Sequence, residues 1–318
     1  MLKVWIAGAN GQIGRALNDV LDPMQIETLN TDLDELDITD TDEVINFGSI
    51  NRPDVIINCT GITDTDECEK NPEHAYRVNA LGARNLSIVA RKCGAKIVQL
   101  STDDVFDGKS KKPYTEFDDT NPLTVYGRSK RAGENYVKEF THKHFIIRSN
   151  WVYGKGGNNF VNRVLETAEK GQALSVASDQ FGSPTSAKDL ARMILYLIDT
   201  NEYGTYHVTC SGVCNRYEFA TEILRLAGKE IELRSVPTEE SDLSSVRPPY
   251  AVLDNFILRI IEVYDMPDWK ASLREYMDER EKYKRENTAE KENGPYHEDL
   301  CGADRRCDTG NHSLLPGS

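Results

Sequence analysis

Tyr126 and Lys130 lie four residues apart in the sequence. On a helix this spacing places both side chains on one face, where they reach the same small volume. A free tyrosine titrates near pH 10, so a tyrosine that donates a proton near neutral pH needs its pKa lowered by about three units, or about 4 kcal/mol. A positive charge about 4 Å away supplies roughly that energy at an effective dielectric constant of about 20. The pair therefore predicts a proton donor, Tyr126, whose pKa Lys130 lowers, although a charged surface helix offers the same spacing.

The residues just upstream place this pair beside a ligand site. The apolar run from Lys96 to Leu100 predicts a strand that ends directly at Ser101 and Thr102. Open α/β sheets bind their ligands where strands end and helices begin. We therefore expect Thr102 to lie near Tyr126.

A glycine-rich turn follows the first predicted strand. This strand, Lys3 to Ala7, is followed by Gly8, Gly11 and Gly14 and then by a helical pattern of apolar residues. Glycines let the backbone turn tightly and approach a pyrophosphate, whose charge is stabilised by the positive end of the helix. The turn therefore predicts dinucleotide binding; the alternative is an ordinary tight turn between a strand and a helix.

Asp32 follows the second predicted strand, Gln25 to Leu29, where a carboxylate can accept hydrogen bonds from an adenosine ribose. Asp34 and Asp37 compete for this role. No arginine or lysine accompanies Asp32, whereas a ribose phosphate needs a cation, so the sequence slightly favours NADH. The choice between NADH and NADPH stays open.

Strand-like and helix-like segments alternate through the first half of the chain. Asp54 to Asn58 is an unbroken apolar strand typical of a buried parallel sheet, a long helix is expected from near Pro72, and a fifth strand runs from His144 to Arg148. Asn79 lies on the apolar face of the long helix, either as a buried amide that joins two segments or as a catalytic group. The alternation predicts an α/β fold with a Rossmann-type doubly wound parallel sheet over residues 1–150.

After residue 150 the alternation loosens. A helix is expected from Asn159, a strand from Ala173 to Val176, and a turn-rich segment, typical of a ligand cleft, from Asp179 to Thr185. We therefore predict a smaller C-terminal α/β substrate-binding lobe over residues 151–277, interleaved with the first domain. Residues 278–318 are charged and poor in apolar side chains, so they cannot offset the entropy of ordering and are expected to form a disordered tail.

The overall charge and composition exclude several classes of protein. A formal net charge of −14 over 318 residues argues against nucleic acid or an anionic membrane as a partner. The chain enters a strand-like run at Lys3, which leaves no room for a signal peptide, and no apolar stretch approaches the length of a membrane span. Seven cysteines, an odd number, suit reduced thiols. We therefore expect a cytoplasmic protein, and a homodimer is left open.

The sequence gives little support for a metal site. His297, Cys301, Cys307 and His312 lie in the charged tail, but their spacing matches no standard zinc pattern. No ligand cluster in the folded portion suggests a catalytic metal, so none is expected.

From Met1 to about Met277 the chain resembles the dTDP-4-dehydrorhamnose reductases, a family of the extended short-chain dehydrogenase/reductases. The motifs fall in family order, and those from Thr102 to Gln180 are the most specific. They are the glycine turn Gly8 to Gly14, Leu36-Asp37-Ile38-Thr39, Pro53 to Asn58, Val78-Asn79-Ala80, Ser101-Thr102-Asp103 with Val105 to Gly108, Tyr126-Gly127 with Ser129-Lys130, Gly133-Glu134, Trp151 to Gly154, Asn159-Phe160-Val161, Asp179-Gln180 with Gly182, Pro184 and Thr185, and Arg247-Pro248.

The resemblance implies an NAD(P)H-dependent oxidoreductase. Its reaction would reduce the 4-keto group of dTDP-4-dehydro-L-rhamnose to give dTDP-L-rhamnose for cell-surface polysaccharide biosynthesis. By resemblance Tyr126 is the proton donor, Lys130 lowers its pKa and holds the nicotinamide ribose, and Thr102 hydrogen-bonds the reacting oxygen. In the site of the nucleotide-diphosphate sugar, Thr102, Asp103 and Trp151 would line the sugar, and Asn159, Gln180 and Arg247 would lie toward the diphosphate. The cofactor would be bound by Gly8, Asn10, Gly11, Gln12, Ile13, Gly14, Asp32, Asp37, Ile38, Gly61 and Thr63, together with Tyr126 and Lys130.

Two stretches depart from the family pattern. Asp104 stands where the family usually has a tyrosine, and this added carboxylate would repel a diphosphate or alter sugar preference unless it faces solvent. The loop Cys59 to Ile62 replaces one that is usually rich in alanine. Two alternatives therefore stay open: a reductase of another nucleotide-linked 4-keto-6-deoxy sugar, and a non-catalytic cofactor-binding subunit resembling the regulatory subunit of methionine adenosyltransferase.

Overall fold

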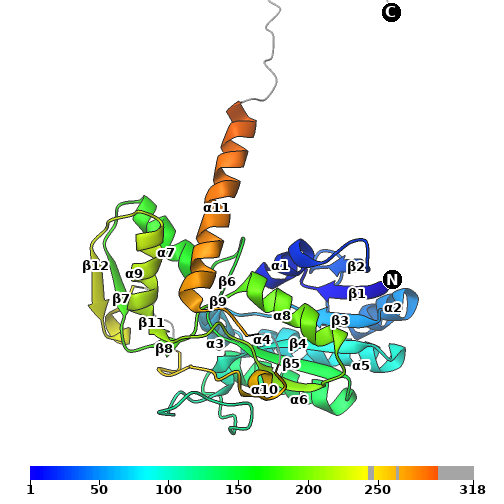
Figure 1. Cartoon of the computed structure of the whole chain (residues 1–318). Helices are drawn as coiled ribbons and strands as arrows, with labels where there is room; N and C mark the ends of the chain where they lie inside the picture. The colour runs from blue at the N-terminus through cyan, green and yellow to red at the C-terminus, as the bar shows by residue number, and fades with distance from the viewer. Residues whose placement is uncertain (243–246, 263–264, 293–318) are drawn as a thin grey trace, which may run out of the picture. The chain divides into compact units, whose positions relative to one another are not determined.

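The computed structural model describes residues 1–242, 247–262 and 265–292, with side chains up to residue 285. Met1 to Arg280 form one compact unit, and the described residues from Glu281 to Glu292 belong to a second, smaller one. In the first unit, helices cover both faces of a sheet of six parallel strands (Figure 1). The strands in spatial order are β10 (Gly204–His207), β5 (His144–Ser149), β4 (Lys96–Thr102), β3 (Val55–Asn58), β1 (Leu2–Ala7) and β2 (Ile26–Thr31).

Alternate residues of the central strand β1 face opposite helical layers. Val4 and Ile6 pack in the hydrophobic cluster that contains the buried faces of α1 and α8. Trp5 and Ala7 pack in the cluster that contains the buried faces of α2, α5 and α6. Burial of one large apolar side chain stabilises the fold by about 1.5–3 kcal/mol, so the two clusters hold the sheet between its layers. The covering helices are α1 (Gln12–Val20), α8 (Ala187–Asp199), α2 (Thr41–Asn51), α5 (Ala83–Cys93) and α6 (Val125–Phe140).

The strand order reverses beside β1. The chain passes from β1 to β2 on one side and then crosses back to β3 on the other side of β1. Such a switch point opens a crevice outside the carboxyl ends of the strands, where open α/β sheets bind their ligands. The loops that follow β1, β3, β4 and β5 all leave the sheet at this edge.

Short strands and two helices form a second group of elements within the same compact unit. β7 (Leu174–Ala177) pairs in parallel with β12 (Leu233–Val236), and α7 (Phe160–Glu169) packs against α9 (Arg216–Leu226). Because α8 and β10 lie between β7 and α9 in the sequence, this group and the main sheet are interleaved along the chain. The remaining elements are the paired strands β6 (Val152–Tyr153) and β9 (Thr185–Ser186), the paired strands β8 (Phe181–Gly182) and β11 (Cys214–Asn215), the 3₁₀ turns Asp103–Val105 and Thr238–Glu240, and the helices α10 (Phe256–Ile260) and α11 (Trp269–Glu292).

The long helix expected from near Pro72 is divided into shorter segments. Asn71 ends the first segment and caps the second by accepting the N–H of His74, while Pro72, which has no N–H, begins the second. A π-helical segment that carries Asn79 then precedes α5, and such segments are frequent at functional sites. The segments are α3 (Thr65–Lys70), α4 (Pro72–Tyr76), the π-helix (Arg77–Gly82) and α5.

Helix α2 begins after a short loop. Asp37 to Asp40 form a loop, and the helix begins at Thr41. The Asp40 carboxylate accepts the N–H groups of Asp42 and Glu43, which caps the helix.

Helix α11 is longer than expected. It continues to Glu292, so residues 278–292 are helical where we predicted a disordered tail. The lysines, arginines and glutamates of this segment are good helix formers, which explains the difference. Residues 293–318, including the four residues considered for zinc, lie outside the described part of the chain. Among the helices that the structure describes, none has the length and apolar character needed to cross a membrane.

Candidate active site

The glycine turn joins β1 to α1 at the carboxyl edge of the sheet. Gly8 has a φ of 80°, a left-handed conformation that favours glycine. The N–H groups of Gly8 and Ala9 donate to the carbonyl of Thr31 at 2.8 and 3.1 Å, which fixes the turn to the end of β2. Gly11 is the N-cap residue of α1, and it has no side chain to bond the first N–H groups of the helix. The first N–H groups of this helix therefore suit the pyrophosphate of a dinucleotide.

Gly14 is packed so tightly that a side chain would displace the turn. A Cβ atom at this position would lie 2.4 Å from the carbonyl oxygen of Gly8 and 2.6 Å from the Cα of Ala9. We expect Gly14→Ala to weaken NAD(P)H binding by about tenfold or more, because the backbone must shift where the pyrophosphate approaches. Fluorescence titration with cofactor measures this loss.

Gly11→Ala is the matched control for Gly14→Ala. Its Cβ would lie 3.3 Å from the same Gly8 oxygen, a contact that a small adjustment relieves. We expect this variant to bind cofactor better than Gly14→Ala, and equal affinities would contradict the packing argument.

Of the three aspartates that compete for the ribose, Asp32 is the one joined to the glycine turn. Its carboxylate accepts the N–H of Asn10 at 2.8 Å and the N–H of Leu33 at 2.9 Å. Asp37 instead accepts the N–H of Thr39 at 2.8 Å within its own loop. Ile38, expected at the cofactor, is only 5% exposed and packs in the hydrophobic cluster that contains Trp5 and Ala7.

Lys130 faces the loop that follows β3. The side chain is 3% exposed, and its Nζ lies 3.5 Å from the position that a Cβ on Gly61 would occupy. Burial lowers the pKa of Lys130 to about 8, against the charge of Glu134, which raises it. The structure thus brings together Lys130 and Gly61, both expected to contact the cofactor, while Thr63 is exposed two residues further on.

Asn79 behaves as the buried amide that was one of its two sequence interpretations. Its Oδ1 accepts the N–H of Ile62 at 2.9 Å, and its Nδ2 donates to the Ile62 carbonyl at 3.0 Å and to Ser129 Oγ at 2.9 Å. The side chain therefore ties the loop after β3 to α6, the helix that carries Tyr126 and Lys130.

Tyr126 is the second residue of α6, and its side chain is 7% exposed. Burial raises the pKa of the phenol, and the charge of Asp104 raises it further, whereas the charge of Arg247 and a hydrogen bond with Thr102 lower it. The guanidinium of Arg247 lies 5.8 Å from the centre of the Tyr126 ring. Arg247 therefore supplies the strongest lowering effect, a role that the spacing argument gave to Lys130.

Asp103 and Asp104 are two adjacent buried carboxylates. Asp103 accepts hydrogen bonds from Thr102 Oγ1 at 3.0 Å and Asn150 Nδ2 at 2.6 Å. Burial and the charge of Asp104 raise the pKa of Asp103 to about 7. Asp104 is fully buried, which excludes the solvent-facing alternative, and its Oδ2 forms an ion pair with Arg247 Nη1 at 2.8 Å. This pair places Arg247 beside Tyr126.

Asn159 and Gln180, both expected at the diphosphate, are engaged with the protein. Asn159 Nδ2 donates to Gln12 Oε1 at 2.9 Å, which connects the start of α7 with the glycine turn. Gln180 Nε2 donates to Thr238 Oγ1 at 3.3 Å. Asn159 thus lies on the cofactor side of the site.

Trp151 is held in an uncommon backbone conformation. Its φ is 45°, and a Cβ on Gly182 would lie 2.6 Å from its indole ring, so this contact requires glycine. The guanidinium carbon of Arg216 lies 3.7 Å from the centre of the ring. Arg216 is not among the site residues predicted from the sequence. Two neighbouring residues could have drawn attention to it, because Asn215 and Glu218 predict that a helix starts at this point. The positive charge of Arg216 then lies in the first turn, where the helix dipole disfavours a cation.

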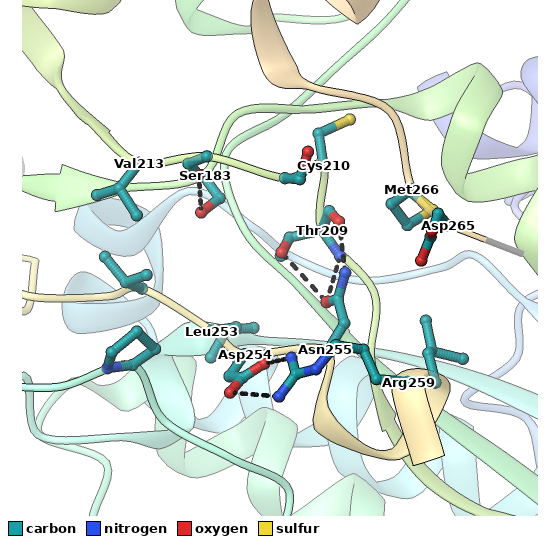
Figure 2. Close-up of a pocket in the computed structure, with 15 residues that line it drawn as sticks. Ser183, Thr209, Cys210, Val213, Leu253, Asp254, Asn255, Arg259, Asp265 and Met266 are labelled. Atoms are coloured by element: carbon teal, nitrogen blue, oxygen red, sulfur yellow. Dashed lines mark hydrogen bonds and ion pairs between the residues drawn. The ribbon is translucent and has the colours of Figure 1, made fainter. Parts of the chain in front are cut away.

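A cavity of about 540 Å³ lies apart from these residues (Figure 2). Its polar groups bond to one another: Asn255 Nδ2 donates to the Thr209 carbonyl at 2.7 Å, and Asp254 forms an ion pair with Arg259. None of the predicted site residues lines it.

Within the described ranges, no group of three or more histidine, cysteine, aspartate or glutamate side chains is placed to hold a metal ion.

Residues 2–282 match the family described as the RmlD substrate binding domain. The chain belongs to this family. It is 41% identical over 282 residues to the spore coat polysaccharide biosynthesis protein SpsK of Bacillus subtilis, covering 88% of this chain and 98% of that protein. It is 34% identical over 270 residues to the dTDP-4-keto-6-deoxy-D-glucose reductase of Streptomyces niveus, covering 84% and 94% of the two chains.

A solved structure shares the fold of this RmlD-family chain. The dTDP-4-dehydrorhamnose reductase of Bacillus anthracis, crystallised in complex with NADP, has a TM-score of 0.85 and 41% sequence identity. The match covers 88% of this chain and all of that one, 100%. The expected Rossmann-type α/β fold and family are therefore confirmed.

Proposed function

We propose that this chain is an NAD(P)H-dependent reductase that converts dTDP-4-dehydro-L-rhamnose to dTDP-L-rhamnose in nucleotide-sugar and polysaccharide biosynthesis. The observation that carries this proposal is a buried phenol and a buried amine on one face of α6. Tyr126 adjoins Thr102 at the end of β4, and Lys130 adjoins Gly61 after β3. Membership of the RmlD family supports the same chemistry.

NAD(P)H, when bound, supplies the hydride that adds to C4 of the sugar. Tyr126 donates its proton to the 4-keto oxygen, which becomes a hydroxyl. Burial raises the pKa of Tyr126, which is opposite to the lowering predicted from the spacing of Tyr126 and Lys130, so the phenol stays protonated before reaction and the charge of Arg247 acts to release the proton. The hydroxyl of Thr102, which donates to Asp103 in this structure, is placed to hydrogen-bond the same oxygen. Lys130 holds the nicotinamide ribose.

The same proposal assigns the remaining predicted site residues to the cofactor or to the sugar. The glycine turn with Asp32 and Gly61 holds the cofactor, and Asp103 with Trp151 holds the sugar. The lobe over residues 151–277 supplies the substrate side of the site. We also propose a cytoplasmic location, which the five unpaired cysteines among the described residues support. Light scattering tests the homodimer that the sequence left open.

A second candidate is reduction of another dTDP-linked 4-keto-6-deoxy sugar. Asp104 occupies the family's usual tyrosine position and fixes Arg247 next to Tyr126, so the walls of the sugar site differ from those of the family. The relative from Streptomyces niveus is named for a different 4-keto sugar. Parallel assays with both sugars distinguish the two candidates.

The test of the proposed function follows the absorbance of NADH and NADPH in the presence of freshly prepared dTDP-4-dehydro-L-rhamnose. We expect turnover, and the ratio of the two rates shows which cofactor Asp32 selects. Cofactor binding without turnover of any dTDP-linked 4-keto sugar would favour the non-catalytic subunit.

Lys130 gives the cofactor affinity a pH dependence. Its amine is charged below its pKa of about 8 and neutral above it. We expect NAD(P)H affinity to fall severalfold as the pH rises above about 8, because a neutral amine holds the ribose less strongly. Cofactor titrations across this range measure the effect. Lys130→Met, similar in length and without charge, should bind weakly at every pH, and an unchanged pH dependence in this variant would contradict the assignment.

A further inference from the structure

Arg216 is a cation that lies over two aromatic rings. Its guanidinium carbon lies 3.7 Å from the ring centre of Trp151 and 4.8 Å from that of Phe160. It is the first residue of α9, and the side chain is half-buried. Such stacking orients the planar guanidinium and leaves its N–H groups at the edge of the stack.

The N–H groups of Arg216 have no acceptor in the protein as far as it is described. No hydrogen bond or ion pair joins this side chain to any residue in 1–242, 247–262 or 265–292, whereas Arg148 pairs with Glu134 at 2.8 Å and Arg247 pairs with Asp104 at 2.8 Å. The half-buried guanidinium therefore has N–H groups to offer, and an anionic ligand would supply charge-assisted acceptors for them.

The surroundings of Arg216 place that ligand at the active site. Burial and the charge of Arg247 lower the pKa of Arg216 to about 9, and Asp103 raises it, so the guanidinium lies within electrostatic range of both. Trp151, on which it stacks, follows β5 at the carboxyl edge of the sheet. An arginine in the first turn of a helix also opposes the helix dipole, a conflict that an anion resolves.

We propose that Arg216 binds the diphosphate of the nucleotide-sugar substrate, an inference that rests on the proposed function. The planar fork of a guanidinium matches two phosphate oxygens, which suits the diphosphate that links the sugar to the nucleoside. Arg247, expected at the diphosphate from the sequence, is instead paired with Asp104. Arg216, from the smaller lobe, takes over this contact.

The test compares dTDP with thymidine as probes of the cofactor-loaded protein by calorimetry. In Arg216→Gln we expect the Kd of dTDP to rise by about tenfold or more, equivalent to about 1.4 kcal/mol, while thymidine affinity stays within about twofold. Arg216→Lys, which keeps the charge without the fork, should bind dTDP better than Arg216→Gln. Arg225→Gln is the matched control, since Arg225 lies on the same helix and pairs with Glu222 at its exposed surface.

The outcomes separate this inference from the proposed function. Wild-type affinity for dTDP in Arg216→Gln would overturn the inference alone, as would an equal loss of dTDP and thymidine, which indicates a structural role. If Arg216→Gln does not fold, Arg216→Lys provides the test. If this variant binds dTDP with wild-type affinity and with the same dependence on salt concentration, the bidentate contact is overturned. A wild-type protein that binds no dTDP would overturn the proposed function as well.

Discussion

Replacing Tyr126 with phenylalanine is expected to lower kcat by about 10²–10⁴-fold while cofactor affinity stays within a few-fold, because general acid catalysis typically contributes that much. The change removes one hydroxyl and little volume from a side chain packed against Cys68, Ala75 and Val125. Stopped-flow absorbance of the reduced nicotinamide measures kcat, and fluorescence titration measures the cofactor Kd.

Tyr136→Phe is the control for this variant. Tyr136 lies on the same helix, α6, and loses the same hydroxyl, but it lies outside the candidate site. We expect its kcat to match the wild type. Equal activity of Tyr126→Phe and Tyr136→Phe would remove Tyr126 from the mechanism.

Glu134 is expected to be the costliest polar residue to replace. Its side chain is fully buried and accepts bonds from Arg148 Nε and Nη2 at 2.8 Å each, from Ser101 Oγ at 2.6 Å and from Arg131 Nη1 at 3.0 Å. Glu134→Gln leaves Arg148, itself 3% exposed, as an uncompensated buried charge. We expect the free energy of unfolding to fall by about 3–5 kcal/mol, measured by urea denaturation.

The exposed Glu139 on the same helix provides the control. Glu139→Gln should change the free energy of unfolding by no more than about 0.5 kcal/mol. A similar small change in Glu134→Gln would show that the buried pair contributes little.

The contribution of Glu134 should also depend on pH. The hydrogen bonds and charge of Arg148, acting against burial, lower the pKa of Glu134 from 4.5 to about 2 in the folded protein. A lowered folded pKa gives stability that is fully present above the unfolded value and is lost as the pH falls toward the folded value. The difference in unfolding free energy between wild type and Glu134→Gln should therefore be constant above about pH 5 and shrink between about pH 4.5 and 2. A difference that does not change with pH would contradict the assigned pKa.

The sequence was informative wherever local pattern and global fold agree. The apolar runs at Lys3 and Asp54 predicted central strands because strands buried on both faces carry few polar residues. The spacing of Tyr126 and Lys130 placed both on α6, and both are buried beside loops at the carboxyl edge of the sheet. Such features depend on periodicity and chain order, which a single sequence contains.

The features that the sequence did not reveal depend on contacts between distant segments. Asp104 and Arg247 are far apart in the chain, so their ion pair and the full burial of Asp104 required the folded structure. Arg216 is an ordinary helix-start arginine until Trp151 and Phe160 are placed around it. The hydrogen bonds of Asn79 with Ile62 and Ser129 likewise join segments that are far apart in the sequence.

The most direct test of the central claim is single-turnover reduction of dTDP-4-dehydro-L-rhamnose by wild-type protein and Tyr126→Phe, each preloaded with NADPH. We expect the wild type to oxidise the cofactor and form dTDP-L-rhamnose, while Tyr126→Phe binds the same cofactor and turns over at least about 10²-fold more slowly. Cofactor oxidation at equal rates in the two proteins, or product formation in neither, would contradict the assignment of Tyr126 as the proton donor of a 4-keto sugar reductase.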